Sequence, residues 1–514
     1  MKKPKRLLVL ALALALCLSG CFSSSSSASP AGLAAKKTFT VAHLFTDAVT
    51  LDPHKTNDSA SVIPIGQIYD TLVTLNDSMN IVPMLATDWA RVDELNWQFT
   101  LRQGVKFHNG EELKALDVAF SFNRLIDPAT AAAAAFMLSS VEKTTAIDDY
   151  TVQITTKAPF ASILYNLTHA ACSILNEKAV TAGGDNYGQN PVGTGAFKFV
   201  RWAKNQAVTL EKFQDYYAGP AAIDEMVIRF IPESATAVAE LQTGGVDIVL
   251  NVPPQYRRVI ENEADLKIDS ISTFIVKYIA FDHRKAPFDD IRVRQAVNYA
   301  TDNQAIINVA YEGNAQQLTG PLAPLINGYN PALKGYGLDI EKAKQLMADA
   351  GYANGFSTTL YLSDKEEDAK IATVLKEQLK EIGVELELQI IEWGPYLART
   401  AEGVPMFILG WTTVTADADN GMYSNFHSRA WGNQGNRSFY KNAEVDRLLD
   451  AARSEFDPAA RTKMYQDASA LIVEDAVWDF LSVNNYMVGM NKHVTGFKPV
   501  PTTLFRFYSI DITK

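Results

Sequence analysis

The sequence predicts an α/β protein divided into two or three domains. Segments with the alternating hydrophobic pattern of strands and segments with the 3.6-residue pattern of helices follow one another along the chain, which is typical of α/β architecture. Roughly 480 of the 514 residues remain once a leader and a tether are set aside, and one hydrophobic core does not organise so long a chain. Hydrophobic residues make up 47% and charged residues 20%, as in ordinary globular proteins.

The predicted elements interleave from residue 38 onward. The strands include Thr38–Leu44, Trp97–Leu101, Thr151–Thr155, Ala196–Trp202, Val208–Phe213, Met226–Ile231, Val246–Leu250, Phe274–Phe281, Thr358–Leu362, Val384–Ile391 and Met406–Trp411. The helices include Leu116–Ile126, Ser234–Thr243, Ile291–Ala300, Ile340–Ala350, Glu366–Ile382, Val445–Arg453 and Ala459–Val473. We expect Asp339 to cap the helix that begins at Ile340, and Gly383 to end the helix Glu366–Ile382.

The first residues predict a lipoprotein signal peptide over 1–20. Four basic residues precede the apolar run Leu7–Leu18, which is too short to span a bilayer of about 30 Å. The run ends in Leu18-Ser19-Gly20-Cys21, where a peptidase can cut and the thiol of Cys21 can carry a lipid. Residues 21–35, with five consecutive serines, predict a flexible tether. The alternative is an ordinary signal peptide with an incidental cysteine.

Charge and cysteine content exclude several classes of protein. The net charge is −11 and becomes more negative when the basic leader is removed, which disfavours a nucleic-acid partner. Only Cys172 remains beyond Cys21, so no internal disulfide can form. We interpret Cys172, within an apolar run, as a buried small hydrophobic residue; the alternative is a reactive thiol.

Motifs for catalysis or cofactors are absent from the sequence. There is no nucleophile elbow, zinc-protease, C-x-x-C or phosphate-binding glycine motif, and the seven histidines lack metal-ligand spacing. Asp417 and Asp419 form a D-x-D pair, for which a loop that binds solvent or a ligand amine is a better interpretation than a metal site. We therefore expect no cofactor, no metal and no enzyme, with a surface hydrolase as the alternative from another class.

Five segments in order resemble the extracellular solute-binding proteins of family 5, which serve peptide and nickel ABC importers. They are Leu51-Asp52-Pro53-His54 with Ile68-Tyr69-Asp70-Thr71-Leu72; Leu101 to Gly110 with Lys114 to Phe122, Arg124 and Asp127-Pro128; Asn190-Pro191-Val192-Gly193-Thr194-Gly195-Ala196-Phe197; Arg292 to Ala300; and Gln378-Leu379-Lys380-Glu381-Ile382-Gly383-Val384. The match runs from near Thr38 to the C-terminus.

The resemblance implies a periplasmic-binding-protein-like clamshell with a discontinuous first lobe. The first lobe is expected to comprise 36–74, 190–285 and 495–514, an extra domain 75–189, and the second lobe 286–494. Two chain crossings would form the hinge, and the ligand would lie between the lobes. Most residues of the five segments are scaffold and identify the fold.

The resemblance also implies where the ligand lies, with one departure. In peptide-binding members an aspartate three residues after the Trp of a Gly-Trp pair holds the peptide ammonium. Trp411 matches that Trp, but Val414 stands where the aspartate would be, and Val cannot hold an ammonium. The later Asp417 and Asp419 resemble the glutathione-binding type, so a small peptide, glutathione-like as one option, is expected. The alternative is that both aspartates lie in a solvated turn.

Several further residues are candidates for contact with the ligand. Arg437, on a glycine-rich loop, is the first choice for a ligand carboxylate, ahead of Arg429 and Arg399; the alternative for each is a surface salt bridge. Trp393 and Tyr396 open a helix where relatives place an aromatic against ligand, with core packing as the alternative. The weaker candidates are Tyr69, His427 and Trp431.

The function that the resemblance implies is a transport receptor. It would capture a small peptide outside the cytoplasm, lipid-anchored through Cys21 to a membrane, and deliver it to the permease subunits of an ABC importer, with no nucleic acid and as a monomer. The alternative on the same fold is a receptor for a nickel chelate, an opine or an oligosaccharide. A carboxylate and an arginine in the pocket would favour zwitterions, and stacked aromatics without that pair would favour a sugar.

Overall fold

The computed structural model describes residues 36–56, 58–432 and 435–513 and confirms the α/β class. The predicted leader, the tether and the lipidation site at Cys21 lie outside the described residues. No helix in the described ranges is both long enough and apolar enough to cross a membrane.

A mixed eleven-stranded sheet carries the fold, in the order β15-β14-β16-β12-β17-β11-β1-β10-β9-β8, with β13 paired to β17. Its strands are β1 (Thr38–His43), β8 (Phe197–Ala203), β9 (Ala207–Lys212), β10 (Glu225–Phe230), β11 (Ile248–Leu250), β12 (Leu266–Phe281), β13 (Ala315–Gln317), β14 (Phe356–Ser363), β15 (Val384–Ile391), β16 (Met406–Thr412) and β17 (Trp478–Asn491).

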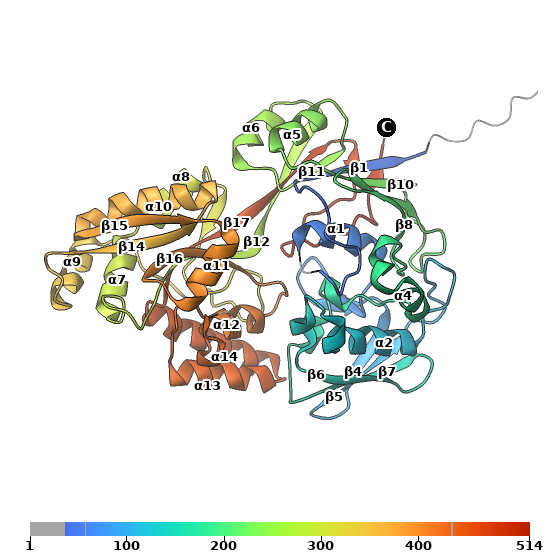
Figure 1. Ribbon diagram of the computed structural model, residues 1–514, viewed down its shortest axis with the longest axis horizontal. Coiled ribbons are helices and arrows are strands. Elements are labelled where there is room, and N and C mark those ends of the chain that lie inside the picture. The colour runs from blue at the N-terminus through green and yellow to red at the C-terminus, as the bar shows by residue number, and fades with distance from the viewer. Residues whose placement is uncertain (1–35, 57, 433–434, 514) are drawn as a thin grey trace, which may run out of the picture. The chain divides into compact units, whose positions relative to one another are not determined.

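Two long strands, β12 and β17, belong to both halves of this sheet. Leu266–Ser272 of β12 pairs with the end of β17 beside β11, and Val276–Ala280 pairs with its beginning beside β16. The antiparallel ladder shifts register between Ser272 and Val276. Figure 1 shows β14, β15 and β16 on one side of this pair and β1, β8 and β10 on the other.

A separate antiparallel sheet, β4-β5-β7-β6, lies in the segment between β1 and β8. Its strands are β4 (Ala86–Arg91), β5 (Asn96–Leu101), β6 (Val141–Ala146) and β7 (Thr151–Thr156), and helix α2 (Ala115–Ile126) packs on β6 and β7. Two further sheets have two strands each: β2 (Val73–Leu75) pairs with β3 (Ile81–Pro83), and β18 (Val494–Thr495) pairs with β19 (Asp511–Ile512).

The α-helices are mostly amphipathic and cover these sheets. They are α1 (Ser59–Ile68), α2 (Ala115–Ile126), α3 (Ile163–Asn166), α4 (Glu177–Gly183), α5 (Ser234–Gln242), α6 (Arg257–Glu261), α7 (Ile291–Ala300), α8 (Asn303–Ala310), α9 (Ile340–Asp349), α10 (Glu366–Leu379), α11 (Trp393–Glu402), α12 (Ala418–Phe426), α13 (Ala443–Ser454) and α14 (Pro458–Glu474).

The predicted strands and helices are all present, and the terminal signals hold. Asp339 caps α9 by accepting a hydrogen bond from the Lys342 backbone, and Gly383 takes a left-handed conformation after α10. The largest element that the prediction lacks is β17, whose residues are buried on both faces over most of its length and so lack an alternating pattern. Helix α1 has no clear signal in the sequence, because Pro64 lies inside it and its apolar residues are not confined to one face.

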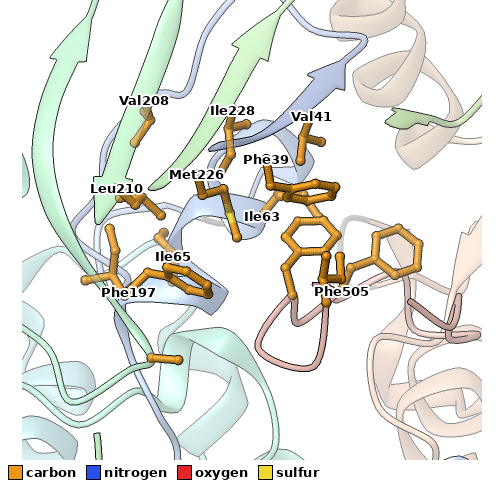
Figure 2. Packing of buried hydrophobic residues seen from close by; sticks show 14 of the residues in the cluster. Phe39, Val41, Ile63, Ile65, Phe197, Val208, Leu210, Met226, Ile228 and Phe505 are labelled. Atoms are coloured by element: carbon orange, nitrogen blue, oxygen red, sulfur yellow. The ribbon is translucent and has the colours of Figure 1, made fainter. Parts of the chain in front are cut away.

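The hydrophobic core divides into several clusters. One joins β1, α1 and β8–β10 to the C-terminal segment, and Figure 2 shows their side chains pointing toward one another, with Phe505 among them. A second cluster packs residues 72–174. The expected boundaries of the lobes stay a prediction. Strand β17 fits them poorly, because Val488 and Met490 pack in the first cluster while Trp478 and Phe480 pack with α12–α14.

The segment 190–195 passes tightly against the end of α1, as its proline and glycines predict. The Gly195 backbone donates to Ile68 O at 2.9 Å. A Cβ atom on Gly193 would lie 2.1 Å from Ile68 O, and one on Gly195 2.4 Å from Gln67 O. Only glycine allows this approach, which fixes the position of Tyr69 and Asp70 just beyond α1.

Candidate functional site

Three adjoining cavities form one continuous groove. The large cavity, about 620 Å³, includes Asn251, Tyr311, Trp393 and Gly410 in its lining. The middle cavity, about 100 Å³, shares Ser59 and Thr412 with the large one. The third, which we name the Arg506 cavity, is about 430 Å³ and shares Val62, Ala170, Val414, Thr502 and Leu504 with the middle one. The groove therefore runs between β16 with its following loop on one wall and α1 with the C-terminal segment on the other.

The edge of β16 contributes backbone to the groove. Strand β14 pairs with β16 only at Met406 and Phe407, whereas β12 pairs along its whole length. No other described strand covers the far edge beyond Phe407, and Leu409, Gly410 and Thr412 line the large cavity. An extended chain in the groove can therefore meet the backbone of β16 at Gly410 and Thr412, beyond Ile408, whose carbonyl accepts from the Tyr396 hydroxyl.

Val414 lies in the wall between the middle cavity and the Arg506 cavity. Its backbone N–H donates to Asn420 Oδ1 at 3.1 Å, which fixes the loop after β16. The groove therefore presents an apolar side chain at the place where the resemblance would have put a carboxylate.

Asp417 is absent from the lining of the three cavities and is buried in a cluster of its own. Its carboxylate accepts from Arg461 Nη1 at 2.5 Å and Nη2 at 2.7 Å, and from Ser162 Oγ at 3.0 Å. It also caps α12 through the Asp419 backbone N–H. We name Asp417, Arg461 and Ser162 the closed cluster, since all three are almost fully buried. Ligand binding by Asp417 stays a prediction that this geometry does not favour.

Asp419 is also buried and lies beside Arg453. Its Oδ1 is 2.9 Å from Arg453 Nε, without the alignment of a hydrogen bond. Burial raises the pKa of the Asp419 carboxyl, and the charge of Arg453 opposes that shift. The alternative of a solvated turn is wrong for both aspartates, because burial excludes water from them.

Arg437, Tyr396 and Arg399 serve helix α11 in this structure. Arg437 Nη1 donates to Thr400 Oγ1 at 2.7 Å and to the Leu397 carbonyl, and burial lowers the pKa of its guanidinium. The buried Tyr396 hydroxyl donates to the Ile408 carbonyl of β16. Arg399 is exposed and pairs with Glu402 at 3.2 Å. None of the three lines the groove, so their ligand role stays a prediction.

Trp393 is 40% exposed and lines the large cavity, with the Lys365 ammonium 4.2 Å from its ring centre. Beside it lies a charged group that the sequence did not reveal, because its members come from two distant segments. Lys277 of β12 is buried and pairs with Asp368 and, at 3.3 Å, with Glu367. Burial lowers the pKa of Lys277, but the Asp368 charge raises it above its ordinary value overall.

The remaining predicted residues have partners within the protein. Tyr69 borders the Arg506 cavity, but its hydroxyl is 3.0 Å from Tyr187 Oη and 3.2 Å from Leu51 O. His427 is buried, stacks on Tyr423 at 4.3 Å and lies 3.3 Å from Asp450. Trp431 is exposed and donates to Tyr440 O at 2.9 Å. Trp411 packs against the hydrophobic cluster that contains Trp478 and Phe480, and its buried Nε1 has no hydrogen-bond partner among the described residues.

Arg506 is the main site residue that the sequence alone did not indicate. It lines the cavity named after it, and its Nη1 lies 2.8 Å from the fully buried Asp70 carboxylate. Burial raises the pKa of Asp70, while the Arg506 charge lowers it in part. An arginine between two aromatic residues near a C-terminus carries no local signal of binding, so only the fold reveals its place.

Cys172 lies in the core of the segment 72–174. Cys172 is fully buried, as predicted, and burial raises the pKa of its thiol. Within the described ranges no three His, Cys, Asp or Glu side chains are grouped so that they could hold a metal ion.

Two half-sheets joined by two long strands, with a groove lined from both sides, define a two-lobed solute-binding protein. The family model of bacterial extracellular solute-binding proteins, family 5, matches residues 80–433. The chain belongs to this family. The glutathione-binding protein GsiB of Pectobacterium atrosepticum is 33% identical over 497 residues, which cover 95% of this chain and 96% of that protein.

Solved structures agree with this assignment. The periplasmic binding protein DppA of Helicobacter pylori, in complex with the peptide STSA, has a TM-score of 0.79 and 32% identity over 93% of this chain and 98% of its own. The binding protein AgaA of A. tumefaciens R10, in complex with agropinic acid, has a TM-score of 0.77 and 27% identity over 93% and 99% of the two chains. These matches confirm the clamshell fold and the family that the resemblance implied.

Proposed function

We propose that this protein is the substrate-binding component of an ABC importer, and that it binds a short peptide in the groove and delivers it to the membrane permease. The observation that carries the proposal is the groove itself, in which an open edge of β16 faces segments of the other half of the sheet. Backbone pairing on such an edge accepts many peptide sequences. The glutathione-binding and peptide-bound relatives support a peptide ligand.

The protein acts in this proposal as a monomeric receptor and not as an enzyme. Its lipid on Cys21 holds it on a membrane outside the cytoplasm, and the serine-rich tether keeps it near the permease. Membrane fractionation tests the anchor: a Cys21→Ala variant should move to the soluble fraction, whereas Cys172→Ala should stay with the membrane. Release of both or of neither would contradict lipidation at Cys21.

A thermal-shift panel tests the ligand class. Glutathione, dipeptides, tripeptides and a tetrapeptide are compared with agropinic acid, nickel–histidine and a cello-oligosaccharide. A ligand at 100 times its dissociation constant stabilises the folded state by about 2.7 kcal/mol, so a true ligand raises the melting temperature clearly. We expect stabilisation by at least one peptide. Stabilisation by the sugar or by nickel–histidine alone would contradict the proposal.

An opine is the second candidate, because the related AgaA structure holds agropinic acid. An opine and a short peptide both carry carboxylate, so the same groove could recognise either. Stabilisation by agropinic acid without any response to peptides would favour the opine.

A further inference from the structure

We propose that the Arg506 cavity binds a carboxylate of the ligand, and that Arg506 selects peptides with an acidic group at the end that lies beyond Val414. A γ-linked glutamyl end has such a group. This inference rests on the proposed function and names the chemical class of its ligand.

Arg506 is held rigidly at the wall of its cavity. Its neighbours Phe505 and Phe507 are 2% and 0% exposed and pack in the core that Figure 2 shows. The Gln67 side chain of α1 forms hydrogen bonds with the backbone of both neighbours. Its Nε2 donates to Phe505 O at 2.7 Å, and its Oε1 accepts from Phe507 N at 2.9 Å. With both neighbours turned into the core, the side chain between them faces the cavity.

Only part of the Arg506 guanidinium is used inside the protein. Nη1 donates to Asp70 Oδ1 at 2.8 Å and to Tyr69 O at 3.5 Å. Neither Nε nor Nη2 has a hydrogen bond to any described residue, and the side chain keeps 34% of its exposure. Asp70 is fully buried behind it and is held by Thr194 Oγ1 at 3.3 Å, so the pair orients the guanidinium without closing it off.

The other groups of the cavity favour an anion. The charged lining consists of Arg506, Lys498 and Asp77, and the last two pair with each other at 3.1 Å while both are more than 70% exposed. Val414 stands at the entrance from the middle cavity and adds no negative charge. An ammonium group would find its only lining carboxylate already paired and in water, whereas a carboxylate would find the free N–H groups of Arg506.

The recognition follows from the shape of the two groups. A guanidinium presents parallel N–H donors that match the two oxygens of a carboxylate, and a carboxamide cannot accept both. Hydrogen bonds to charged groups are strong enough for this difference to change affinity about tenfold or more.

Calorimetric titration of the purified protein tests the inference with matched ligand pairs. Each pair differs by a carboxylate against a carboxamide: glutathione against its analogue with a glutamyl α-carboxamide, and Glu-Ala against Gln-Ala. We expect the wild type to prefer the acid by about tenfold in at least one pair. Arg506→Gln should reduce that ratio to near one, and Arg506→Lys should keep part of it.

Two controls separate selection from folding. Arg506→Gln combined with Asp70→Asn replaces the ion pair by two amides, so its melting temperature shows whether lost binding reflects a stranded Asp70 charge. Lys463→Gln removes an exposed cation that lines none of the three cavities and should leave the ratio unchanged. A ratio of one in the wild type, a ratio unchanged in Arg506→Gln, or a ratio abolished by Lys463→Gln would overturn the inference. Failure of the wild type to bind any peptide would overturn the proposed function itself.

Discussion

Two arginine–aspartate pairs differ in what the protein leaves open. In the closed cluster, Asp417 is 0% and Arg461 6% exposed, and Ser162 joins both of them. In the second pair Asp70 is equally buried, but Arg506 keeps 34% of its exposure and borders a cavity. The same two residue types thus serve as scaffold where each group has internal partners and as a binding element where some donors remain free.

The largest expected effect concerns the closed cluster. Asp417→Asn leaves the buried Arg461 charge unpaired, so we expect the free energy of unfolding to fall by about 3–5 kcal/mol. Urea titration followed by tryptophan fluorescence measures the change. Asp467→Asn, which removes an exposed pair with Lys463, is the matched control and should cost less than about 1 kcal/mol. Loss of peptide affinity in Asp417→Asn without loss of stability would break the comparison and restore Asp417 as a ligand anchor.

A third buried carboxylate, Asp479, shows what happens without an arginine. It accepts from Asn303 Nδ2 at 3.0 Å, and burial raises its pKa to about 6. An acid whose pKa is higher in the folded state loses stability as the pH rises, here from about 4 through 6, and the loss is complete above both values. Asp479→Asn should therefore stabilise the protein by up to about 3 kcal/mol at pH 7.5.

The pH dependence makes that test specific. At pH 4 the folded Asp479 is nearly all protonated and the unfolded residue is about half protonated, so the variant should gain little over the wild type. Melting temperatures from pH 4 to pH 8 measure the gap, which should widen as the pH rises. A gap that stays constant across this range would show that the Asp479 side chain is not the titrating group.

Adding a carboxylate to the groove should reverse the preference for an acidic ligand end that Arg506 is proposed to give. Val414→Asp places an anion at the entrance of the Arg506 cavity, where it attracts an ammonium and repels an acidic ligand end. We expect affinity for Gln-Ala to rise about tenfold relative to Glu-Ala, a change of about 1.4 kcal/mol. Val414→Asn is the control of similar size without charge. Equal effects of Asp and Asn on both dipeptides would count against the electrostatic explanation.

The smallest expected effect is the removal of one hydroxyl from the closed cluster. Ser162→Ala takes away the donor to Asp417 Oδ1 and an acceptor for Arg461 Nη2, which still has Asp417 and Tyr465. Stability should fall by about 1 kcal/mol in the urea titration. Ser454→Ala, whose hydroxyl donates to the carbonyl one turn earlier on an exposed helix end, should change it less. A loss as large as that of Asp417→Asn would mean that Ser162 is essential to the pair.

Much of the fold could be predicted from the sequence, because strands and helices are local patterns. Val384–Ile391 and Glu366–Leu379 alternate or repeat as their structures require, and cap residues such as Asp339 act within one turn. Strand β17 could not be predicted in this way, since it is buried on both faces and its character comes from the strands beside it.

The site was harder to predict, because its residues meet only through the fold. The loop Trp411 to Asp419 was placed at the groove by resemblance, and Val414 does lie there. The side chains of Asp417 and Asp419 turn to Arg461 and Arg453, which follow them by dozens of residues and which no local pattern joins to them. Arg506 was missed for the same reason, since Gln67 and Asp70 of the N-terminal part hold it in place.

The long pair of strands β12 and β17 has a mechanical consequence. A two-stranded ribbon bends easily across its flat face, while bending within its plane stretches the hydrogen bonds between its strands. The ladder shifts register twice, between Ser272 and Val276 and between Lys277 and Tyr278, and these interruptions make this short stretch the most easily bent. The two halves of the large sheet are therefore joined by a pair of strands that bends more easily across its face than within its plane. We expect closure to bend the sheet along this stretch, so that the same two groove walls meet a captured molecule each time.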